Sequence, residues 1–371
     1  NDGRILSNAR TAHITEGTKP GLGRVTCQYR NRCMRGCPYG AYFSSNSSTL
    51  PAAEATGNMT LMPNSIVHEI IYDEENKKAK GVRVIDAENN QSYEYFAKVI
   101  FLCSSTVGST SILMQSKSNR FPNGMGNDSG ELGHNIMDHH FQVGASGTFK
   151  GFKNKTTFGR KPAGFYIPRF RNIGGITDRK DYIRGYQYQG GANRGFMSIA
   201  DSKEELVSYG PRFKENIVKR DEWTASMTGF GEILPYHDNK MTLNYDKKDQ
   251  WGLPTVTFDA KIRENEITMR KDMKIQAEEM LERSGFKDVY GNESKYVFGN
   301  GIHEMGTARM GNDPKTSVLN ANNQIHDVKN VYVTDGACMT SAGNQNPSIT
   351  YMALTARAAK HAVDELNKQN I

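Results

Sequence analysis

Apolar and polar positions in residues 58–105 form three runs, MTLMPNSIVHEIIYDE, KAKGVRVID and YEYFAKVIFLCSS, separated by polar turns. Short apolar or alternating runs bounded by turn residues are typical of strands, so we expect three strands of a nucleotide-binding sheet. The third run ends in small residues, and a helix is expected to begin near Thr110. Ser104 and Ser105 would let the backbone approach a ligand at this turn. A tight strand-to-helix turn without a ligand is the alternative.

Residues 141–260 carry a different pattern. Aromatic-rich alternating segments such as GFYIPRF and MTLNYD predict a mainly antiparallel sheet with one face covered. Two helices are expected after it. The first spans 263–283, and the second runs from about Asn346 to Asn367. The inward positions expected for the two helices are Ile267, Met273, Ile275, Met280 and Leu281 in the first, and Ile349, Met352, Ala356, Ala359 and Val363 in the second.

The composition fits a globular chain of two intermixed domains, with 371 residues of which 37% are hydrophobic. The net charge of +7 is spread along the chain without a basic run, which favours a solvated surface over nucleic-acid binding. No stretch approaches 18 consecutive apolar residues, so no membrane span is expected. The N-terminus, NDGRILSNAR, carries no secretory pattern and is expected to be an internal start.

Candidate chemistry lies near the C-terminus. His303 sits in the glycine-rich segment GNGIHEMGTARMG, and a structural role is the usual one for a lone histidine. The segment VYVTDGACMTSAGNQNPSITYMALTARAA follows it, and predicts a strand, an Asp-Gly turn, a polar loop and a helix that opens at Asn-Pro. The two blocks together form a more specific signal than either block alone.

These blocks resemble the C-terminal signature of the GMC (glucose-methanol-choline) oxidoreductase family, His-x-x-Gly-Thr, Val-x-Asp and Asn-Pro. The matching positions begin at His303, Val333 and Asn346. Two further segments, GELGHNIMDHH and DQWGLPTVTF, are similar to family segments, so the resemblance covers nearly the whole chain.

The resemblance implies an FAD-dependent oxidoreductase. It makes His303 the base that takes the proton of a substrate hydroxyl while hydride leaves for the flavin, and it makes Asn346 the residue that holds the oxygen. Imidazole titrates near neutral pH, which suits a reversible proton acceptor. Cofactor contacts are expected, by family position or by the small-residue turn described above, at Val67, Ser104, Ser105, Asp335, Gly336 and Pro347.

The implied fold is α/β (α+β), with a partial, Rossmann-like GMC-type FAD-binding domain and a substrate domain whose mainly antiparallel sheet is covered by helices. The expected ranges are 1–140 and 296–371 for the FAD-binding domain and 141–295 for the substrate domain. The family's G-x-G-x-x-G phosphate-binding turn is not found in the chain, so the N-terminal Rossmann part is expected to lie outside it. Sugar contacts are candidates at Tyr166, Tyr186, Tyr188 and His237.

Three of the five cysteines lie close together, as Cys27-x5-Cys33-x3-Cys37 within the loop 24–43. Three thiolates can hold a three-iron cluster, and structural zinc or free or disulfide-linked cysteines are the alternatives. Of the other two cysteines, Cys103 is expected to be a buried core thiol. The spacing looks like that of bacterial GMC sugar, gluconate and glucoside dehydrogenases with a [3Fe-4S] cluster.

That subgroup implies electron transfer from the flavin through the cluster to a cytochrome c or a quinone, a small accessory subunit, and a periplasmic location. The expected function is therefore oxidation of a sugar or glycoside hydroxyl. One alternative is a GMC flavin oxidase or choline-like alcohol dehydrogenase without a cluster. Another is an electron-transfer or binding fragment without flavin.

Overall fold

The computed structural model describes residues 4–16, 23–30, 33–155, 164–194, 210–211, 213–214 and 222–371. The chain divides into two compact units. Unit 1 comprises Asn1–Leu61, Phe141–Phe230 and Thr268–Lys295, and unit 2 comprises Met62–His140, Gly231–Ile267 and Tyr296–Ile371. The domain ranges given above stay predictions, because compactness alone does not define a functional domain.

Unit 1 is built on a six-stranded sheet with the strand order β1-β7-β8-β9-β6-β12. Each pairing with a described register is antiparallel, so the predicted antiparallel sheet is confirmed. The strands are β1 (Ser7–Asn8), β6 (His139–Phe149), β7 (Phe165–Ile167), β8 (Tyr186–Asn193), β9 (Trp223–Glu232) and β12 (Lys287–Glu293).

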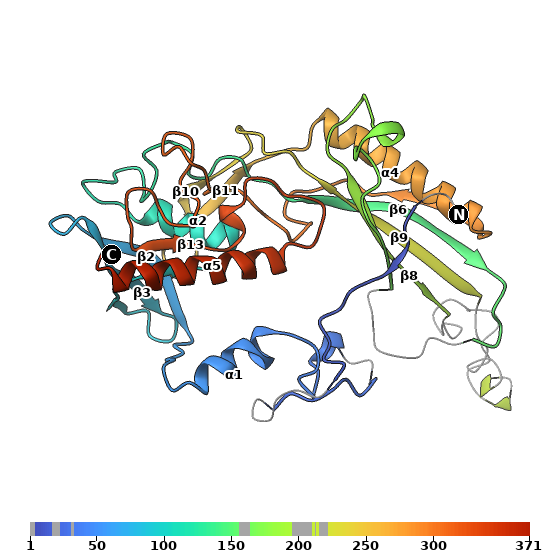
Figure 1. The fold of residues 1–371 in the computed structure, drawn as a ribbon, viewed down its shortest axis with the longest axis horizontal. Helices are drawn as coiled ribbons and strands as arrows, with labels where there is room; N and C mark the ends of the chain where they lie inside the picture. Colours follow the sequence, from blue (N-terminus) through green and yellow to red (C-terminus); the bar gives the residue numbers. More distant parts are fainter. Residues whose placement is uncertain are drawn as a thin grey trace. The chain divides into compact units, whose positions relative to one another are not determined.

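Helix α4 (Glu264–Arg283) covers one face of this sheet, and Figure 1 shows it lying along β6, β8 and β9. Its buried side chains include Met269, Met273 and Ala277, which pack against Tyr188 and other sheet residues in one apolar cluster. The helix was predicted correctly. Two of its expected inward positions were wrong, because Ile267 and Ile275 are exposed.

Unit 2 contains three small sheets. An antiparallel sheet joins β2 (Ser65–Asp73), β3 (Lys78–Asp86) and β4 (Ser92–Phe96), and a second antiparallel pair joins β10 (Lys240–Lys248) to β11 (Pro254–Asp259). The third sheet is a parallel pair of β5 (Ile100–Leu102) and β13 (Val331–Val333). The third predicted run is therefore two strands in two different sheets.

Helix α2 (Ser105–Gln115) follows β5 directly and begins five residues earlier than Thr110, the predicted start. Its Leu113 joins β5, β13 and the loop 318–328 in the main apolar core of the unit. Unit 1 also has a short helix, α1 (Thr49–Glu54), beyond the cysteine loop.

Helix α5 (Ser348–Asn367) has the predicted length, but its expected inward face was wrong. Ile349, Met352 and Val363 are exposed, and Ala358 and Ala362 are buried against Tyr332 instead. Ala356 and Ala359, the other two expected inward positions, are exposed as well, so the buried face of the helix is rotated away from the predicted one. Figure 1 shows α5 beside β13.

Candidate active site

The carboxylate of Asp138 organises the loop that carries His303. Asp138 is fully buried and accepts five hydrogen bonds. Oδ2 accepts from the Tyr296 hydroxyl and from the backbone N–H groups of Gly299 and Gly301, at 2.9, 3.2 and 2.9 Å. Oδ1 accepts from the backbone N–H groups of His139 and His303, at 2.7 and 3.1 Å. One carboxylate therefore sets the position of both histidines.

The two histidines contact each other edge to face, with Nδ1 of His139 2.9 Å from Nδ1 of His303. Nε2 of His139 lies 3.1 Å from the carbonyl oxygen of Gly343, which can only accept, so this nitrogen carries a proton. Burial first, and the neighbouring His303 second, lower the pKa of His139 to about 4, so the ring is neutral at neutral pH. Its Nδ1 is then an acceptor.

It follows that His303 donates through its own Nδ1–H, which leaves Nε2 of His303 as an unprotonated acceptor. Burial lowers the pKa of His303, and the Asp138 charge only partly offsets this effect. The ring is half-buried. The structure thus presents a neutral imidazole with one basic nitrogen.

The amide of Asn346 lies beside that nitrogen, with Nδ2 3.5 Å from Nε2 of His303. Asn346 is exposed and directly precedes Pro347, the N-cap residue of α5. A hydroxyl oxygen within hydrogen-bond distance of both nitrogens could give its proton to the imidazole and accept a hydrogen bond from the amide. The structure therefore brings the two predicted catalytic residues together.

The segment that follows His303 ties this pair to the rest of unit 2. Gly306 has a φ of 87°, and a Cβ there would lie 2.1 Å from the Asn135 carbonyl oxygen, so only glycine fits. The Gly306 N–H donates to the Gly336 carbonyl oxygen at 3.0 Å, and the Thr307 hydroxyl bonds that of Thr110 on α2 at 2.7 Å. The His-x-x-Gly-Thr segment is thereby held against the turn after β13.

Four of the predicted cofactor residues follow the parallel strands β5 and β13, whose carboxyl ends meet at one sheet edge. Ser104 and Ser105 are exposed at the start of α2, and Ser105 has a φ of 65°, which is unusual for a residue other than glycine. Asp335 accepts hydrogen bonds from Ser109 Oγ at 2.5 Å and from the Ala337 N–H at 2.9 Å. Burial raises the pKa of Asp335, and these two bonds oppose the rise.

Gly336 is packed against the protein itself, since a Cβ there would lie 2.4 Å from both the Glu304 carbonyl oxygen and Thr106 Oγ1. Of the remaining two predicted positions, Pro347 is buried at the start of α5, and Val67 is a half-buried residue of β2 that pairs with Val84. Neither lies on the β5–β13 edge.

Two buried polar atoms in the segment 344–351 fit a bound polar group such as FAD. Within the described residues, Asn344 Nδ2 and the Tyr351 hydroxyl have no hydrogen-bond partner. An unpaired buried donor costs about 1–3 kcal/mol, so such groups in a functional segment are commonly satisfied by a ligand. Asn344 lies between Gly343, which binds His139, and Asn346.

The cysteine loop belongs to unit 1. Its three cysteines are free thiols, of which Cys27 is buried and Cys33 and Cys37 are half-buried. Burial opposes a low pKa at Cys37, yet hydrogen bonds from the backbone of Tyr42, Tyr39, Ala41 and Gly40 outweigh it and lower the pKa of this thiol. Backbone N–H groups directed at sulfur are suited to a thiolate ligand.

The described residues contain no group of three or more His, Cys, Asp or Glu side chains placed to hold a metal, so this structure does not bring the three cysteines together as the ligands of a metal ion or of a cluster. His13 lies beside the cysteine loop, with its Nε2 3.1 Å from Cys33 Sγ.

The prediction that Cys103 is a buried core thiol was wrong, since this residue is exposed at the end of β5.

The four candidate sugar contacts lie in different settings. Tyr186 and Tyr188 are fully buried, and their hydroxyls donate to Asp272 Oδ2 at 2.6 Å and to the Met273 carbonyl oxygen at 2.5 Å, so they are core residues. Tyr166 is half-buried on β7. His237 belongs to unit 2, where its ring stacks on His134.

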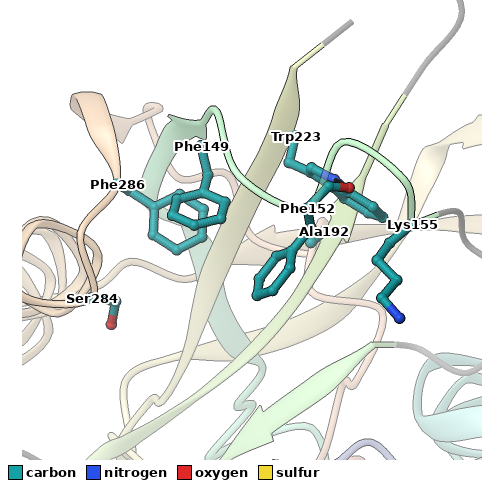
Figure 2. Close-up of a pocket in the computed structure, with 7 residues that line it drawn as sticks. All are labelled: Phe149, Phe152, Lys155, Ala192, Trp223, Ser284 and Phe286. Atoms are coloured by element: carbon teal, nitrogen blue, oxygen red, sulfur yellow. Dashed lines mark hydrogen bonds between the residues drawn. The ribbon is translucent and has the colours of Figure 1, made fainter. Parts of the chain in front are cut away.

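Unit 1 also has an apolar pocket of about 440 Å³, shown in Figure 2. Its aromatic lining includes Phe149 and Phe286, whose ring centroids are 5.6 Å apart. The Trp223 indole N–H in its wall already donates to the Phe152 carbonyl oxygen at 3.2 Å. Among the described residues that line this pocket, Lys155 carries the charge and none is a histidine or a carboxylate.

Sequence reasoning missed the roles of Asp138 and His139. Both lie in GELGHNIMDHH, which was noted only for its similarity to a family segment. The available signal was the adjacency of a carboxylate and an imidazole, a common pair in proton-transfer sites.

No helix in the described part of the chain combines the length and apolar character needed to cross a bilayer.

A solved structure with a similar fold is formate oxidase from Aspergillus oryzae RIB40, with a TM-score of 0.61 and 16% identity over 87% of this chain and 64% of that one. At this identity the likeness shows the fold alone.

Two curated relatives align over most of this chain. 2-Methyl-1,2-propanediol dehydrogenase from Mycolicibacterium austroafricanum is 28% identical over 93% of this chain and 61% of its own length. Fructose dehydrogenase large subunit from Gluconobacter japonicus is 26% identical over 95% of this chain and 62% of its own length. The chain thus spans less than two thirds of either relative. Residues 23–141 and 235–355 match models of GMC oxidoreductases, and the chain belongs to the GMC oxidoreductase family.

Proposed function

We propose that the protein is an FAD-dependent dehydrogenase that oxidises a hydroxyl group of a sugar or glycoside. The observation that carries this proposal is the geometry at His303, whose Nε2 is the basic nitrogen and lies 3.5 Å from Asn346 Nδ2. An alcohol gives up hydride readily only when its oxygen begins to lose a proton, and this pair is arranged to accept that proton and hold the oxygen.

Family membership and the names of the relatives support the chemistry. Both relatives are dehydrogenases of compounds that carry hydroxyl groups on neighbouring carbon atoms, namely a 1,2-propanediol and fructose. FAD is the cofactor that such a reaction and this family imply. The residues we propose to contact it are Ser104, Ser105, Asp335, Gly336 and, by family position, Val67 and Pro347.

When bound, the flavin supplies the acceptor for the hydride that leaves the substrate carbon. The chain's own residues act on the proton. His303 takes it from the hydroxyl at Nε2, His139 keeps the ring in the required tautomer, and Asn346 donates a hydrogen bond to the oxygen as negative charge develops there. Asp138 holds the backbone of both histidines in place.

For the route of the electrons we propose a [3Fe-4S] cluster on Cys27, Cys33 and Cys37, followed by a cytochrome c or a quinone. The lowered pKa of Cys37 supports thiolate ligation. A small accessory subunit and a periplasmic location belong to the same proposal. The competing proposal is a flavin oxidase without a cluster, since paromamine 6'-oxidase from Streptomyces fradiae is 25% identical over 93% of this chain.

The test uses the full-length, flavin-loaded protein, mixed without oxygen with D-glucose, D-fructose or methyl β-D-glucoside while the visible absorbance of the flavin is followed. We expect bleaching by at least one sugar and a rate lower by a factor of about 10²–10⁴ in His303→Ala. His326→Ala is the matched control, because His326 is a half-buried histidine of the same unit whose ring bonds Ser317 and the Leu319 backbone. Equal rates in His303→Ala and wild type would contradict the role of the imidazole.

Electron paramagnetic resonance of the oxidised protein tests the cluster separately, because an oxidised three-iron cluster has an odd electron count. A signal that disappears in Cys37→Ser supports the cluster. An iron-free, silent sample with rapid peroxide formation favours the oxidase.

A further inference from the structure

The apolar pocket of unit 1 is built from this unit alone. Phe149 ends β6, Ala192 lies near the end of β8, Trp223 begins β9, and Phe286 follows α4. The volume of about 440 Å³ falls in the range of small-molecule sites. It is roughly three times that of a cavity that holds one benzene ring.

The aromatic part of the wall is arranged around Phe149. Its ring centroid lies 5.6 Å from that of Phe286 and 5.4 Å from that of Phe152, and both pairs are tilted. Phe286 also packs against the apolar cluster that joins α4 to the sheet, whereas Phe152 is 67% exposed. A ligand ring in the pocket would remove this exposed aromatic surface from water.

The backbone of Phe152 connects the aromatic wall to Lys155. The Phe152 carbonyl oxygen accepts from the Trp223 indole N–H at 3.2 Å and from the Lys155 backbone N–H at 2.9 Å. Phe152 has a φ of 51°, which is uncommon for a bulky residue. Residues held in such conformations are frequent at ligand-binding sites. This turn therefore holds the backbone of Lys155 close to the aromatic wall.

The Lys155 ammonium is the polar group of the wall that is available to a ligand. Within the described part of the chain Lys155 forms no ion pair, whereas Lys150, at the start of the same loop, lies 3.8 Å from a Glu222 carboxylate oxygen. The hydroxyl of Ser284 already donates to the Met280 carbonyl oxygen at 2.7 Å. Figure 2 shows Lys155 on the opposite side of the view from Ser284 and Phe286. The pocket thus combines an apolar end with a positively charged end.

We propose that this pocket binds an aromatic carboxylate. The ring of the ligand packs against Phe149, Phe152 and Phe286, and its carboxylate pairs with the ammonium of Lys155, a compact cation with three donor hydrogens. The proposal goes beyond the function proposed above, because it adds a binding site that involves unit 1 alone and no step of the flavin chemistry.

Fluorescence of Trp223 is the first readout. The full-length, flavin-loaded protein is titrated with 4-phenylbutyrate or with 4-phenyl-1-butanol, which carry the same ring and differ in charge. We expect a saturable change in tryptophan fluorescence and a Kd about threefold lower for the carboxylate, as for an exposed ion pair. The change should disappear in Trp223→Phe and persist in Trp251→Phe, since Trp251 lies between β10 and β11 of unit 2.

Two substitutions of exposed residues test the ring and the charge by calorimetric titration. Phe152→Ala should raise the Kd of 4-phenylbutyrate about fivefold, and Lys155→Gln should abolish the preference for the carboxylate. The matched controls are Phe96→Ala and Lys80→Gln in unit 2. Phe96 is also 67% exposed, and Lys80 Nζ lies 5.8 Å from its ring centroid. Both controls should bind as wild type does.

Four results would overturn the proposal. Two are an absence of any change at Trp223 and a Kd that is the same in Phe152→Ala, Lys155→Gln and wild type. Equal affinities for the carboxylate and the alcohol would indicate an uncharged occupant. A Trp223 signal that changes with protein concentration alone would indicate that a second copy of the chain fills the pocket. Flavin reduction is not measured in these titrations, so their outcome is independent of the proposed function.

Discussion

Nδ1 of His139 lies 2.9 Å from Nδ1 of His303, and this contact decides which nitrogen of His303 can accept a proton. Because Nε2 of His139 is committed as a donor to the Gly343 carbonyl oxygen, its Nδ1 must accept. His303 therefore presents its unprotonated Nε2 to Asn346, while its Nδ1–H donates to the neutral ring of His139.

Removing the acceptor should weaken catalysis without removing the base. In His139→Phe the ring volume is largely kept, but His303 can adopt the other tautomer, so we expect kcat to fall on the order of 10²-fold. Stopped-flow measurement of flavin reduction gives the rate. The control is His134→Phe, a half-buried histidine of the same unit that bonds the His237 carbonyl oxygen, and its kcat should be unchanged. Equal losses in both variants would point to a general packing defect.

The pH dependence of kcat/KM should reflect the lowered pKa of His303. Burial disfavours the imidazolium and lowers the pKa of His303, so more than half of the rings are neutral at pH 6.5, the ordinary pKa of histidine. We expect the acid limb of the rate to be centred below that pH, because protonation removes the base. In His303→Ala this acid limb should vanish. A limb centred well above pH 7 would contradict the assignment.

Asp138 should be a major source of local stability. Asp138→Asn places amide hydrogens against the N–H and O–H donors that now point at both carboxylate oxygens. We expect the free energy of unfolding to fall by about 3 kcal/mol, measured by urea denaturation. Asp128→Asn is the control, since Asp128 forms a part-exposed ion pair with Arg120, and its loss should cost under about 1 kcal/mol. A smaller loss of unfolding free energy in Asp138→Asn than in Asp128→Asn would contradict the greater contribution of Asp138 to stability.

In iron-free protein, Cys37 should react with iodoacetamide faster than Cys103. The backbone hydrogen bonds at Cys37 lower its thiol pKa, whereas desolvation of the sulfur raises that of Cys103 although the residue as a whole is exposed, so more thiolate is present at Cys37 at pH 7. Mass spectrometry of peptides sampled over time gives both rates. Comparable rates, or a faster Cys103, would show that exposure rather than pKa governs reactivity.

The sequence was most informative where structure is local. The strands β2 and β3 and the helix α4 follow from patterns within a few residues, and the His-x-x-Gly-Thr and Asn-Pro segments carry the family resemblance. Asp138 could not be interpreted in the same way, because its partners Tyr296 and His303 lie 158 and 165 residues away in the chain.

Side-chain direction was the least predictable property. The apolar stripe of α5 was expected to point inward, but Ile349 and Val363 are exposed and Ala358 packs against β13. Likewise, the tyrosines of β8 were candidates for the ligand, yet they face α4, and the glutamine between them has the unsatisfied amide. The spacing of apolar residues shows which side chains of a helix or strand share a face. It does not show which of the faces packs against the core.

The neutral state of His139 also restricts the route by which a proton can leave. A proton captured at Nε2 of His303 cannot readily be relayed onward through Nδ1, because His139 has a pKa of about 4 and would have to become a buried cation. The proton must then depart from the same side of the imidazole on which it arrived. The captured proton would thus stay on Nε2 of His303, and it would pass to solvent or buffer only after the oxidised product has moved away from that atom.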